Sequence, residues 1–214
     1  MTSSNAVGFP RWLRWFAGLI AALCWCALAL QLNLIIAEAA KRGFAWPIAL
    51  AVYASFFTIQ VNLLAAIVTS FAAAGIKRWP ARGRIRTAIA VYLSVGGIVF
   101  FVSLRPVWRH TGLQALADAL LHYVIPALYC AFWFFGVPKH DLRWRDAFIW
   151  MIYPTAYLAA VLAFGLWSGY FPYPFIDLRS RDVLSLATGI AGSSGGFLMG
   201  GLLAVALGRL AGAR

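Results

Sequence analysis

The stretch LRWFAGLIAALCWCALALQLNLIIA, residues 13–37, decides the fold class of this chain. It holds a single charged residue, Arg14. About 20 helical residues are enough to cross the roughly 30 Å hydrocarbon core of a bilayer. The stretch therefore predicts a membrane-spanning helix.

Five more apolar stretches of similar kind follow along the chain, at residues 46–75, 87–104, 113–137, 147–167 and 183–207. Short loops that carry most of the charged residues separate them. No low-complexity linker and no second domain interrupts the series. The sequence predicts an all-α, polytopic membrane protein with six transmembrane helices in one bundle over residues 1–214.

The composition agrees with a membrane protein, because 63% of the residues are hydrophobic and only 11% are charged, whereas soluble domains are about 45–50% apolar. A net charge of +12 would suggest nucleic acid in a soluble protein. Here the basic residues lie in short loops, which favours contact with anionic lipid head groups. We expect membrane lipids and no nucleic acid as partners; the oligomeric state is left open.

The distribution of basic residues predicts the orientation. Of the 18 Lys and Arg, twelve lie at the two termini and in the second and fourth loops, and six lie in the other three loops. Cytoplasmic loops carry the excess of Lys and Arg. We therefore expect a multi-pass protein of the inner (plasma) membrane with both termini in the cytoplasm.

Polar side chains form a stripe on each of two predicted spans. In the second span they are Ser55, Thr58, Asn62 and Thr69, spaced by 3, 4 and 7 residues, which keeps them on one helix face. The fourth span carries Asp118, His122 and Tyr129 at spacings of 4 and 7, with Pro126 between the last two. Both stripes enter from the outer side under the predicted orientation, so Thr58 and His122 are expected to meet in the outer half of the bundle.

Such a pair suits acyl transfer. A threonine hydroxyl needs a base to become a nucleophile, and imidazole, with an unperturbed pKa near 6.5, serves this purpose near neutral pH. Asp118 is predicted to accept a hydrogen bond from the other ring nitrogen of His122 and to fix its tautomer. Candidate donors to an oxyanion are Gln60, Asn62 and Tyr129.

Each of these residues also has an interpretation without catalysis. Thr58 can hydrogen-bond to the carbonyl of Ala54 one helical turn earlier, as threonines in membrane helices commonly do. His122 can bond to a neighbouring helix for packing alone. Asp118 lies near the outer interface and can simply be solvated.

Three further features of the sequence are candidates for a site: a glycine-rich stretch, a segment rich in proline and aromatic residues, and the remaining Cys and His residues. Residues 192–196, GSSGG, match G-x-S-x-G around Ser194, but they lie in an apolar helix, and the spacing of Gly192, Gly196 and Gly200 indicates helix packing. The segment YFPYPFID, residues 170–177, is expected either to cap a cavity or to anchor the chain at the interface.

No cofactor or metal site is predicted, since the remaining candidates lack ligand spacing: Cys24, Cys26, Cys130, His110 and His140.

Several motifs in order resemble the bacterial Pr6Pr six-span membrane proteins, which are related to the androgen-induced family of intramembrane threonine hydrolases. The resemblance covers nearly the whole chain and rests on FFTIQVN (56–62), ADALLHYVIP (117–126), VPK (137–139) with LRWRD (142–146), WMIYPTAY (150–157) and YPFID (173–177). In the androgen-induced relatives, a threonine and a histidine hydrolyse fatty acid esters of hydroxy fatty acids. By motif, the resemblance implies these roles for Thr58 and His122, although the spacing from His122 to Pro126 is one residue shorter than in those relatives.

Two functions remain open at this point. One is a lipid-ester hydrolase that uses Thr58 and His122. The other is a non-enzymatic bundle that binds a lipid or transports a small solute. Residues 1–107 and 108–214 show no convincing internal repeat, which favours the hydrolase over a transporter.

Overall fold

The computed structural model describes residues 9–76, 83–179 and 182–212, and these residues form helices and connecting turns without any strand. Six helical segments in this part of the chain are long and apolar enough to cross a membrane. The predicted fold class is therefore confirmed. The six segments are Arg11–Lys41, Phe57–Ala74, Gly83–Leu104, Gly112–Gly136, Trp144–Ser168 and Leu186–Leu210.

Several of these segments contain more than one kind of helix. Between α1 (Arg11–Lys41) and α9 (Val183–Gly212), the elements are α2 (Trp46–Ser55), α3 (Phe57–Ala74), α4 (Gly83–Val99), the π-helical turn η2 (Phe100–Leu104), α5 (Gly112–Ala119), the π-helical turn η3 (Leu120–Val124), α6 (Ile125–Gly136), α7 (Trp144–Trp150), α8 (Ile152–Ser168) and the 3₁₀ turn η4 (Pro174–Ile176).

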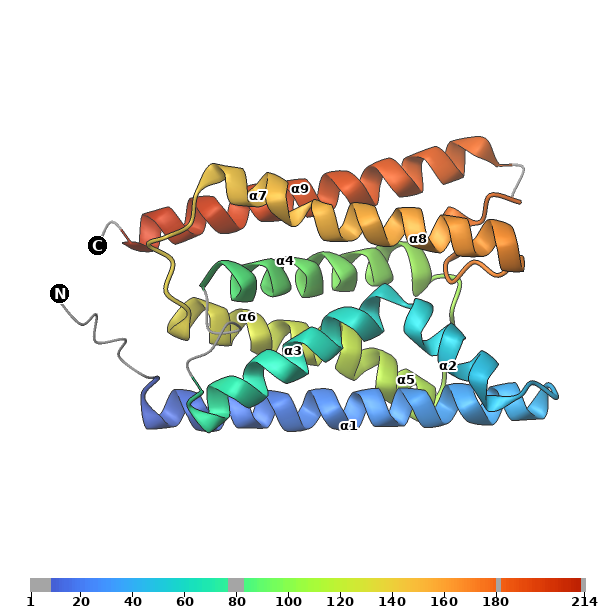
Figure 1. Cartoon of the computed structure of the whole chain (residues 1–214), viewed down its shortest axis with the longest axis horizontal. Helices are drawn as coiled ribbons and strands as arrows, with labels where there is room; N and C mark the ends of the chain where they lie inside the picture. The colour runs from blue at the N-terminus through green and yellow to red at the C-terminus, as the bar shows by residue number, and fades with distance from the viewer. Residues whose placement is uncertain (1–8, 77–82, 180–181, 213–214) are drawn as a thin grey trace.

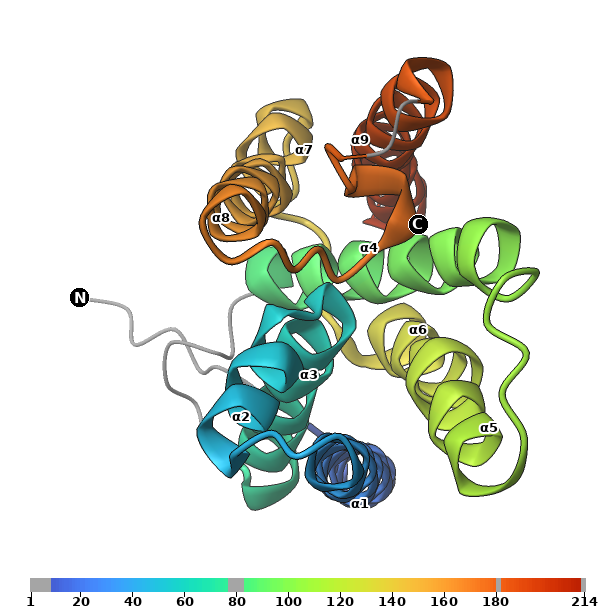
Figure 2. The ribbon, with the colours of Figure 1, turned by 90° about the vertical axis from the view of Figure 1, so that its right-hand side faces the viewer.

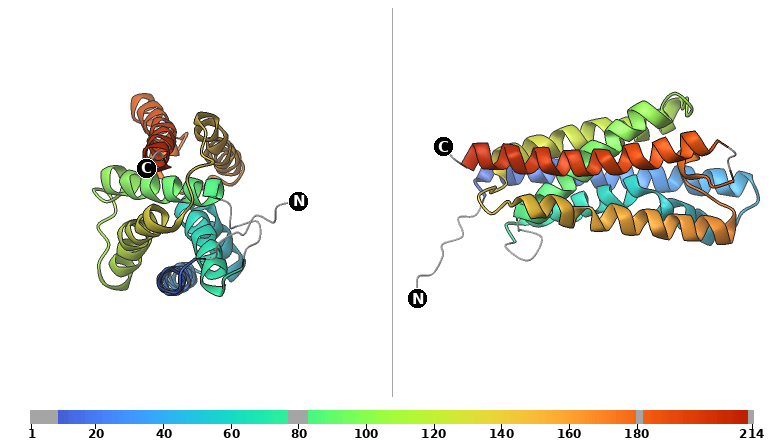
Figure 3. Two further views of the ribbon diagram at one scale, coloured as in Figure 1. Left: turned by 90° about the vertical axis from the view of Figure 1, so that its left-hand side faces the viewer. Right: turned by 90° about the horizontal axis from the view of Figure 1, so that it is seen from above.

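Helix α4 lies in the middle of the bundle and is the most buried of the six spans. It contacts α3 and α6 on one side and α9 on the other. The end view shows α4 between the pair α7–α8 and α9 on one side and α1, α3 and α5–α6 on the other (Figure 2). From above, α9 and α7–α8 run along the same face of the bundle (Figure 3). A helix packed on all sides must be apolar around its circumference, and α4 is buried nearly all round from Arg86 to Leu93.

The prediction of a single span over residues 46–75 is wrong for the first part of that stretch. Residues 46–75 do not form one helix, because Phe56 takes an extended conformation (φ −80°, ψ 124°) and separates α2 from α3. The hydropathy of α2 is that of a span, but the ten residues Trp46–Ser55 are too few to cross a bilayer. The membrane-crossing helix is α3 alone, and its first turn contains Thr58.

The fifth span also changes direction, at Met151 between α7 and α8. Pro154 lacks an N–H and cannot bond to the carbonyl of Trp150 four residues earlier. The Tyr92 hydroxyl, from α4, donates to this carbonyl at 2.6 Å. The kink that proline imposes is thus satisfied by a side chain of the central helix.

The glycine repeat of α9 packs against α4 as predicted at two of its three positions. A Cβ at Gly196 or Gly200 would lie 3.1–3.3 Å from side-chain atoms of Val95 and, for Gly200, also of Val91. At Gly192 a Cβ would meet no atom within 4 Å. The repeat is therefore a packing surface from Gly196 onward, and the prediction for Gly192 is wrong because this position of α9 faces open space.

Helix α1 begins and α9 ends at the same end of the bundle (Figure 1), as an even number of spans requires. Which side of the membrane this end faces stays a prediction from the basic residues, of which Lys77, Arg78, Arg82, Arg181 and Arg214 lie outside the described residues. We expect a reporter fused after Arg214 to be active in the cytoplasm. Activity of that fusion only on the outer side would reverse the orientation.

Candidate active site

The site begins at the break between α2 and α3. The N–H of Phe57, the first residue of α3, donates to the hydroxyls of Tyr173 at 3.0 Å and Tyr157 at 3.2 Å. The Tyr157 hydroxyl in turn donates to the carbonyl of Ser55 at 2.7 Å. A helix start needs partners for its first N–H groups, and here two tyrosines distant in sequence supply them. Thr58 is held next to this cap.

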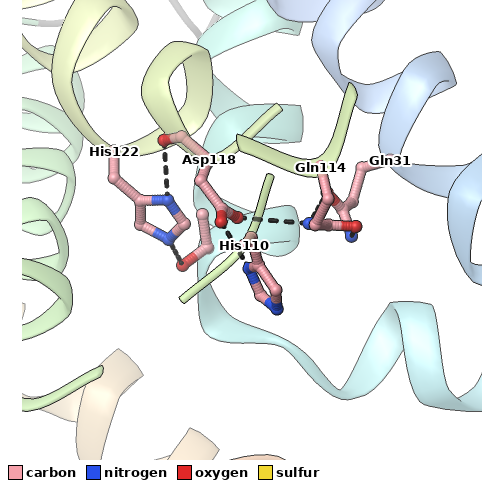
Figure 4. Close-up of polar contacts among 6 residues, drawn as sticks. Gln31, His110, Gln114, Asp118 and His122 are labelled. Carbon is pink, nitrogen blue, oxygen red and sulfur yellow. Dashed lines mark hydrogen bonds and ion pairs between the residues drawn. The ribbon is translucent and has the colours of Figure 1, made fainter. Parts of the chain in front are cut away.

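Thr58 and His122 are in direct contact. The distance from Thr58 Oγ1 to His122 Nε2 is 3.1 Å. On the other side of the ring, His122 Nδ1 lies 3.0 Å from the backbone carbonyl oxygen of Asp118 (Figure 4). A carbonyl oxygen only accepts, so the hydrogen-bond network assigns the ring proton to Nδ1 and a lone pair to Nε2. The Thr58 hydroxyl therefore donates to His122. The predicted meeting of these two side chains is confirmed, and this tautomer is the one that a general base requires.

Thr58 does not bond to its alternative partner, the backbone carbonyl of Ala54. The carbonyl of Ala54 accepts a hydrogen bond from Gln60 Nε2 at 2.8 Å instead. This exchange follows from the break at Phe56, since Ala54 and Thr58 do not belong to one continuous helix.

A π-helical turn carries His122. Pro126 has no N–H for the His122 carbonyl, and its ring would clash with that carbonyl in a regular α-helix. The preceding segment widens to η3, in which Ile125 N–H bonds to the carbonyl of Leu120, five residues earlier. The imidazole stacks on Phe100, with ring centroids 3.8 Å apart and planes inclined by 14°. Phe100 belongs to the other π turn, η2, so both irregular turns meet at this ring.

Close approach of α4 to η3 depends on Gly97. A Cβ at Gly97 would lie 2.5 Å from the His122 carbonyl oxygen, whereas a Cβ at the adjacent Gly96 would meet nothing within 4 Å. We expect Gly97→Ala to destabilise the protein by about 1–3 kcal/mol through overpacking. Gly96→Ala, the matched control, should leave stability unchanged or slightly raised, because alanine favours helix. Thermal unfolding in detergent measures both, and equal midpoints for the two variants would contradict the role of Gly97.

The predicted role of the Asp118 carboxylate is wrong. It does not bond to His122; it accepts from His110 Nδ1 at 2.6 Å and from Gln114 Nε2 at 3.2 Å. Side chains on a helix lean towards its N-terminus. His122 therefore reaches back to the backbone of Asp118, while the carboxylate of Asp118 reaches back to Gln114. The histidine is oriented by a peptide carbonyl and not by a carboxylate.

Asn62 holds the pair in place but faces the backbone. Its Nδ2 donates to the carbonyls of Thr58 at 2.8 Å and Leu121 at 3.3 Å. The amide thus joins α3 to η3 directly beneath the Thr58–His122 contact. Because both donor contacts are to the main chain, the prediction that Asn62 donates to an oxyanion is not supported by this arrangement.

Gln60 and Tyr129 lie away from the reacting groups. Besides its bond to Ala54, Gln60 accepts from the Tyr153 hydroxyl at 2.8 Å. Tyr129 is fully buried, and its hydroxyl has no partner among the described residues. Neither side chain lines the cavity at Thr58. Gln60 follows Thr58 by two residues in α3 and so lies on another face of that helix, and the π turn η3 separates Tyr129 from His122.

Tyr173 is the polar residue that sequence reasoning missed. It lies in the segment 170–177, is buried, and has its hydroxyl in contact with Thr58 and Tyr157. Burial raises the pKa of the Tyr173 phenol above its usual range, so the group keeps its proton. The signal in the sequence was a tyrosine between two prolines. Tyr170 and Tyr173 both line the cavity, which supports the capping interpretation of this segment.

A cavity of about 840 Å³ opens at Thr58 and His122. It lies between the second half of α1, α2, the start of α5 and the end of α8, at the end of the bundle opposite to the start of α1 (Figure 1). Its walls are mostly apolar, with Ile35, Val52 and Phe164 among them. The volume falls in the range of roughly 300–1,000 Å³ that is usual for small-molecule sites.

His122 also lines a second, wide groove of about 550 Å³. The groove runs between α4 and η3, and its walls include Ile98 and Phe101, both more than half exposed. In a membrane such a surface faces lipid. The buried imidazole therefore borders both the cavity at Thr58 and this groove.

Ser194 is placed in the interior of α9, as the sequence predicted, and not in a strand-turn-helix elbow. It lines a small pocket of about 70 Å³ that also touches Thr58. Within the described part of the chain, no group of three or more His, Cys, Asp or Glu side chains could hold a metal ion.

Comparison of the chain with protein-family models, with curated proteins and with solved structures found no match.

Proposed function

We propose that this protein is an intramembrane acyl-ester hydrolase with Thr58 as nucleophile and His122 as base. The observation that carries the proposal is the 3.1 Å contact from the Thr58 hydroxyl to the unprotonated Nε2 of His122, at the wall of a largely apolar cavity. A nucleophile within hydrogen-bonding reach of an oriented base is the arrangement of covalent acyl transfer. The resemblance to the Pr6Pr and androgen-induced proteins, based on the motifs that contain both residues, supports the same reaction.

The reaction follows from these positions. His122 Nε2 takes the Thr58 proton while Oγ1 attacks the ester carbonyl, and the imidazolium then protonates the departing alcohol. Water, activated by the same nitrogen, cleaves the Thr58 acyl ester and releases the fatty acid. Through both steps the Asp118 carbonyl accepts from Nδ1 and keeps the ring in place.

Tyr173 is the best-placed donor to the oxyanion. Its hydroxyl accepts from the Phe57 N–H at 3.0 Å and interacts with the adjacent Thr58, and a protonated phenol can donate to the negative oxygen that develops beside Oγ1. The first turn of α3 adds its positive dipole end at the same point. We assign the oxyanion site to Tyr173 and this helix start, in place of Gln60, Asn62 and Tyr129.

Membrane location enters the proposal through substrate access. A lipid ester can reach His122 from the side, along the groove at Ile98 and Phe101. We propose that the protein works in the inner (plasma) membrane with both termini in the cytoplasm, which places the cavity in the outer half of the bilayer.

Labelling with a fluorophosphonate probe tests the nucleophile. Purified protein would be incubated with the probe and digested, and the modified residue would be identified by mass spectrometry. We expect the label on Thr58 in the wild type and in Ser194→Ala, and none in Thr58→Ala. A label that persists in Thr58→Ala and disappears in Ser194→Ala would move the nucleophile to α9. Absence of any label and of any ester turnover would favour the lipid-binding or transport function instead.

A further inference from the structure

A polar cluster of four side chains lies at one end of the main cavity: Gln31, His110, Gln114 and Asp118. Asp118 accepts from His110 and from Gln114, and the two glutamine amides bond to one another, with 2.9 Å from Gln114 Nε2 to Gln31 Oε1 (Figure 4). The cluster ties α1 to α5 and to the loop before α5. All four side chains line the cavity that contains Thr58.

The cluster and the reacting pair share Asp118. Its backbone carbonyl accepts from His122, and its carboxylate accepts from His110. An ester carbonyl at Thr58 therefore has the polar cluster next to it, and the apolar wall formed by α1, α2 and α8 is left for an acyl chain. A ligand that fits this geometry has a polar part at the cluster, an ester at Thr58 and a hydrocarbon part along the apolar wall.

Charge decides what the polar part can be. Apart from His122 of the reacting pair and the two tyrosines Tyr170 and Tyr173, the charged or ionisable side chains among the described residues that line the cavity are Glu38, Arg42, His110 and Asp118. Arg42 pairs with Glu38 at 2.8 Å, and His110 pairs with Asp118 at 2.6 Å. Arg42 and His110 thus each face a carboxylate, whereas His122 bonds to the Thr58 hydroxyl and to the Asp118 backbone carbonyl. The more buried of the two carboxylates, Asp118, is nearer to the reacting pair, with 13% of its side chain exposed against 53% for Glu38.

A site for a phosphate or carboxylate head group needs cations or N–H donors in excess. Among the described residues that line this cavity, Arg42 and His110 are both paired with a carboxylate. The amides and imidazole of the cluster are instead suited to exchange hydrogen bonds with hydroxyl groups. An anionic head group would lie next to the Asp118 carboxylate, and like charges brought together at a binding site oppose binding.

We propose that the substrate is an uncharged, hydroxyl-bearing acyl ester of the monoacylglycerol class, and that the cluster of Gln31, His110, Gln114 and Asp118 binds its free hydroxyls. The inference rests on the proposed hydrolase function and names its substrate class. One water is consumed for each ester cleaved, and the products are the fatty acid and the polyol. Esters with an anionic head group, including those with a free carboxylate, are poor ligands.

Binding of ether analogues tests the ligand class separately from catalysis, because ethers are not hydrolysed. The probes are a 1-O-alkylglycerol and the same compound with a 3-phosphate, bound to Thr58→Ala in zwitterionic nanodiscs and followed by calorimetry. We expect the neutral ether to bind on the order of tenfold tighter or more. Equal or tighter binding of the phosphate, or no binding of either ether, would overturn the inference.

A second variant separates the effect of the cavity's charge on affinity from the effect of the probes' partition into the bilayer. Glu38→Gln, combined with Thr58→Ala, leaves Arg42 without its carboxylate at an exposed position where folding is not at risk. The affinity for the phosphate ether should rise several-fold relative to Thr58→Ala alone, and the affinity for the neutral ether should not change. An unchanged phosphate affinity would contradict the charge argument.

Turnover separates the two proposals. Selective binding of the neutral ether without turnover of any ester by the wild type would refute the hydrolase and keep the ligand class. Turnover with preference for a phosphate-bearing ester over the matching monoacylglycerol would keep the hydrolase and refute the ligand class.

Discussion

Alanine at Thr58 or at His122 is expected to lower kcat for acyl-ester hydrolysis by roughly a thousandfold or more, and the double variant should lose little beyond either single one. The reason is that the hydroxyl is a nucleophile only while Nε2 takes its proton at 3.1 Å, so removal of either member ends the same step. Residues that act as a unit are strongly non-additive. Initial rates with a fatty-acyl ester in detergent or nanodiscs measure the effect.

Thr69→Ala is the matched control. Thr69 lies on the same helix, is buried, and donates to the carbonyl of Ala65 at 2.7 Å without lining the cavity. It should keep near wild-type kcat. Losses in Thr58→Ala and His122→Ala that simply multiply in the double variant would show that the two side chains contribute independently, and the catalytic pair would then be abandoned.

Tyr173→Phe is expected to lower kcat by about 10²–10³-fold with little change in KM, the range seen when one donor to an oxyanion is removed. The substitution keeps the ring, which stacks on Phe175 with planes inclined by 6°, and deletes only the hydroxyl at Thr58. The Phe57 N–H retains the Tyr157 hydroxyl as a partner. The helix start therefore remains capped while the oxyanion site loses its donor.

Tyr157→Phe serves as the control, because Tyr157 bonds to the same Phe57 N–H but its second bond is to the Ser55 carbonyl. We expect it to lower the unfolding temperature with a much smaller loss of kcat. A trifluoromethyl ketone, which forms a tetrahedral adduct with the nucleophile, adds a readout that a purely structural role would not change. Its affinity should fall for Tyr173→Phe in parallel with kcat, and equal effects of both tyrosine variants on kcat and on this affinity would argue for a structural role of Tyr173.

The sequence by itself determined the fold class and predicted the contact of Thr58 with His122, against the alternative of a bond from Thr58 to the Ala54 carbonyl. Hydrocarbon leaves backbone polar groups no partner except one another, so long apolar runs such as residues 13–37 must be helices. A histidine at that depth also needs a polar partner. The stripe on the fourth span and the stripe on the second span offered few choices, and Thr58 and His122 do meet.

Only the tertiary structure decided the local geometry of the site. The break at Phe56 cannot be read from hydropathy, because the residues on both sides are equally apolar; it is held by Tyr157 and Tyr173, one hundred or more positions away in the chain. Periodicity places a side chain on a face but does not give the direction in which it leans, so the Asp118 carboxylate was assigned to His122 when it bonds to His110. Tyr173 had no polar stripe to reveal it and became part of the site when the segment 170–177 folded over the start of α3. Helical spans are fixed by local hydrophobicity, whereas caps, kinks and hydrogen-bond partners depend on contacts between segments that are remote in sequence.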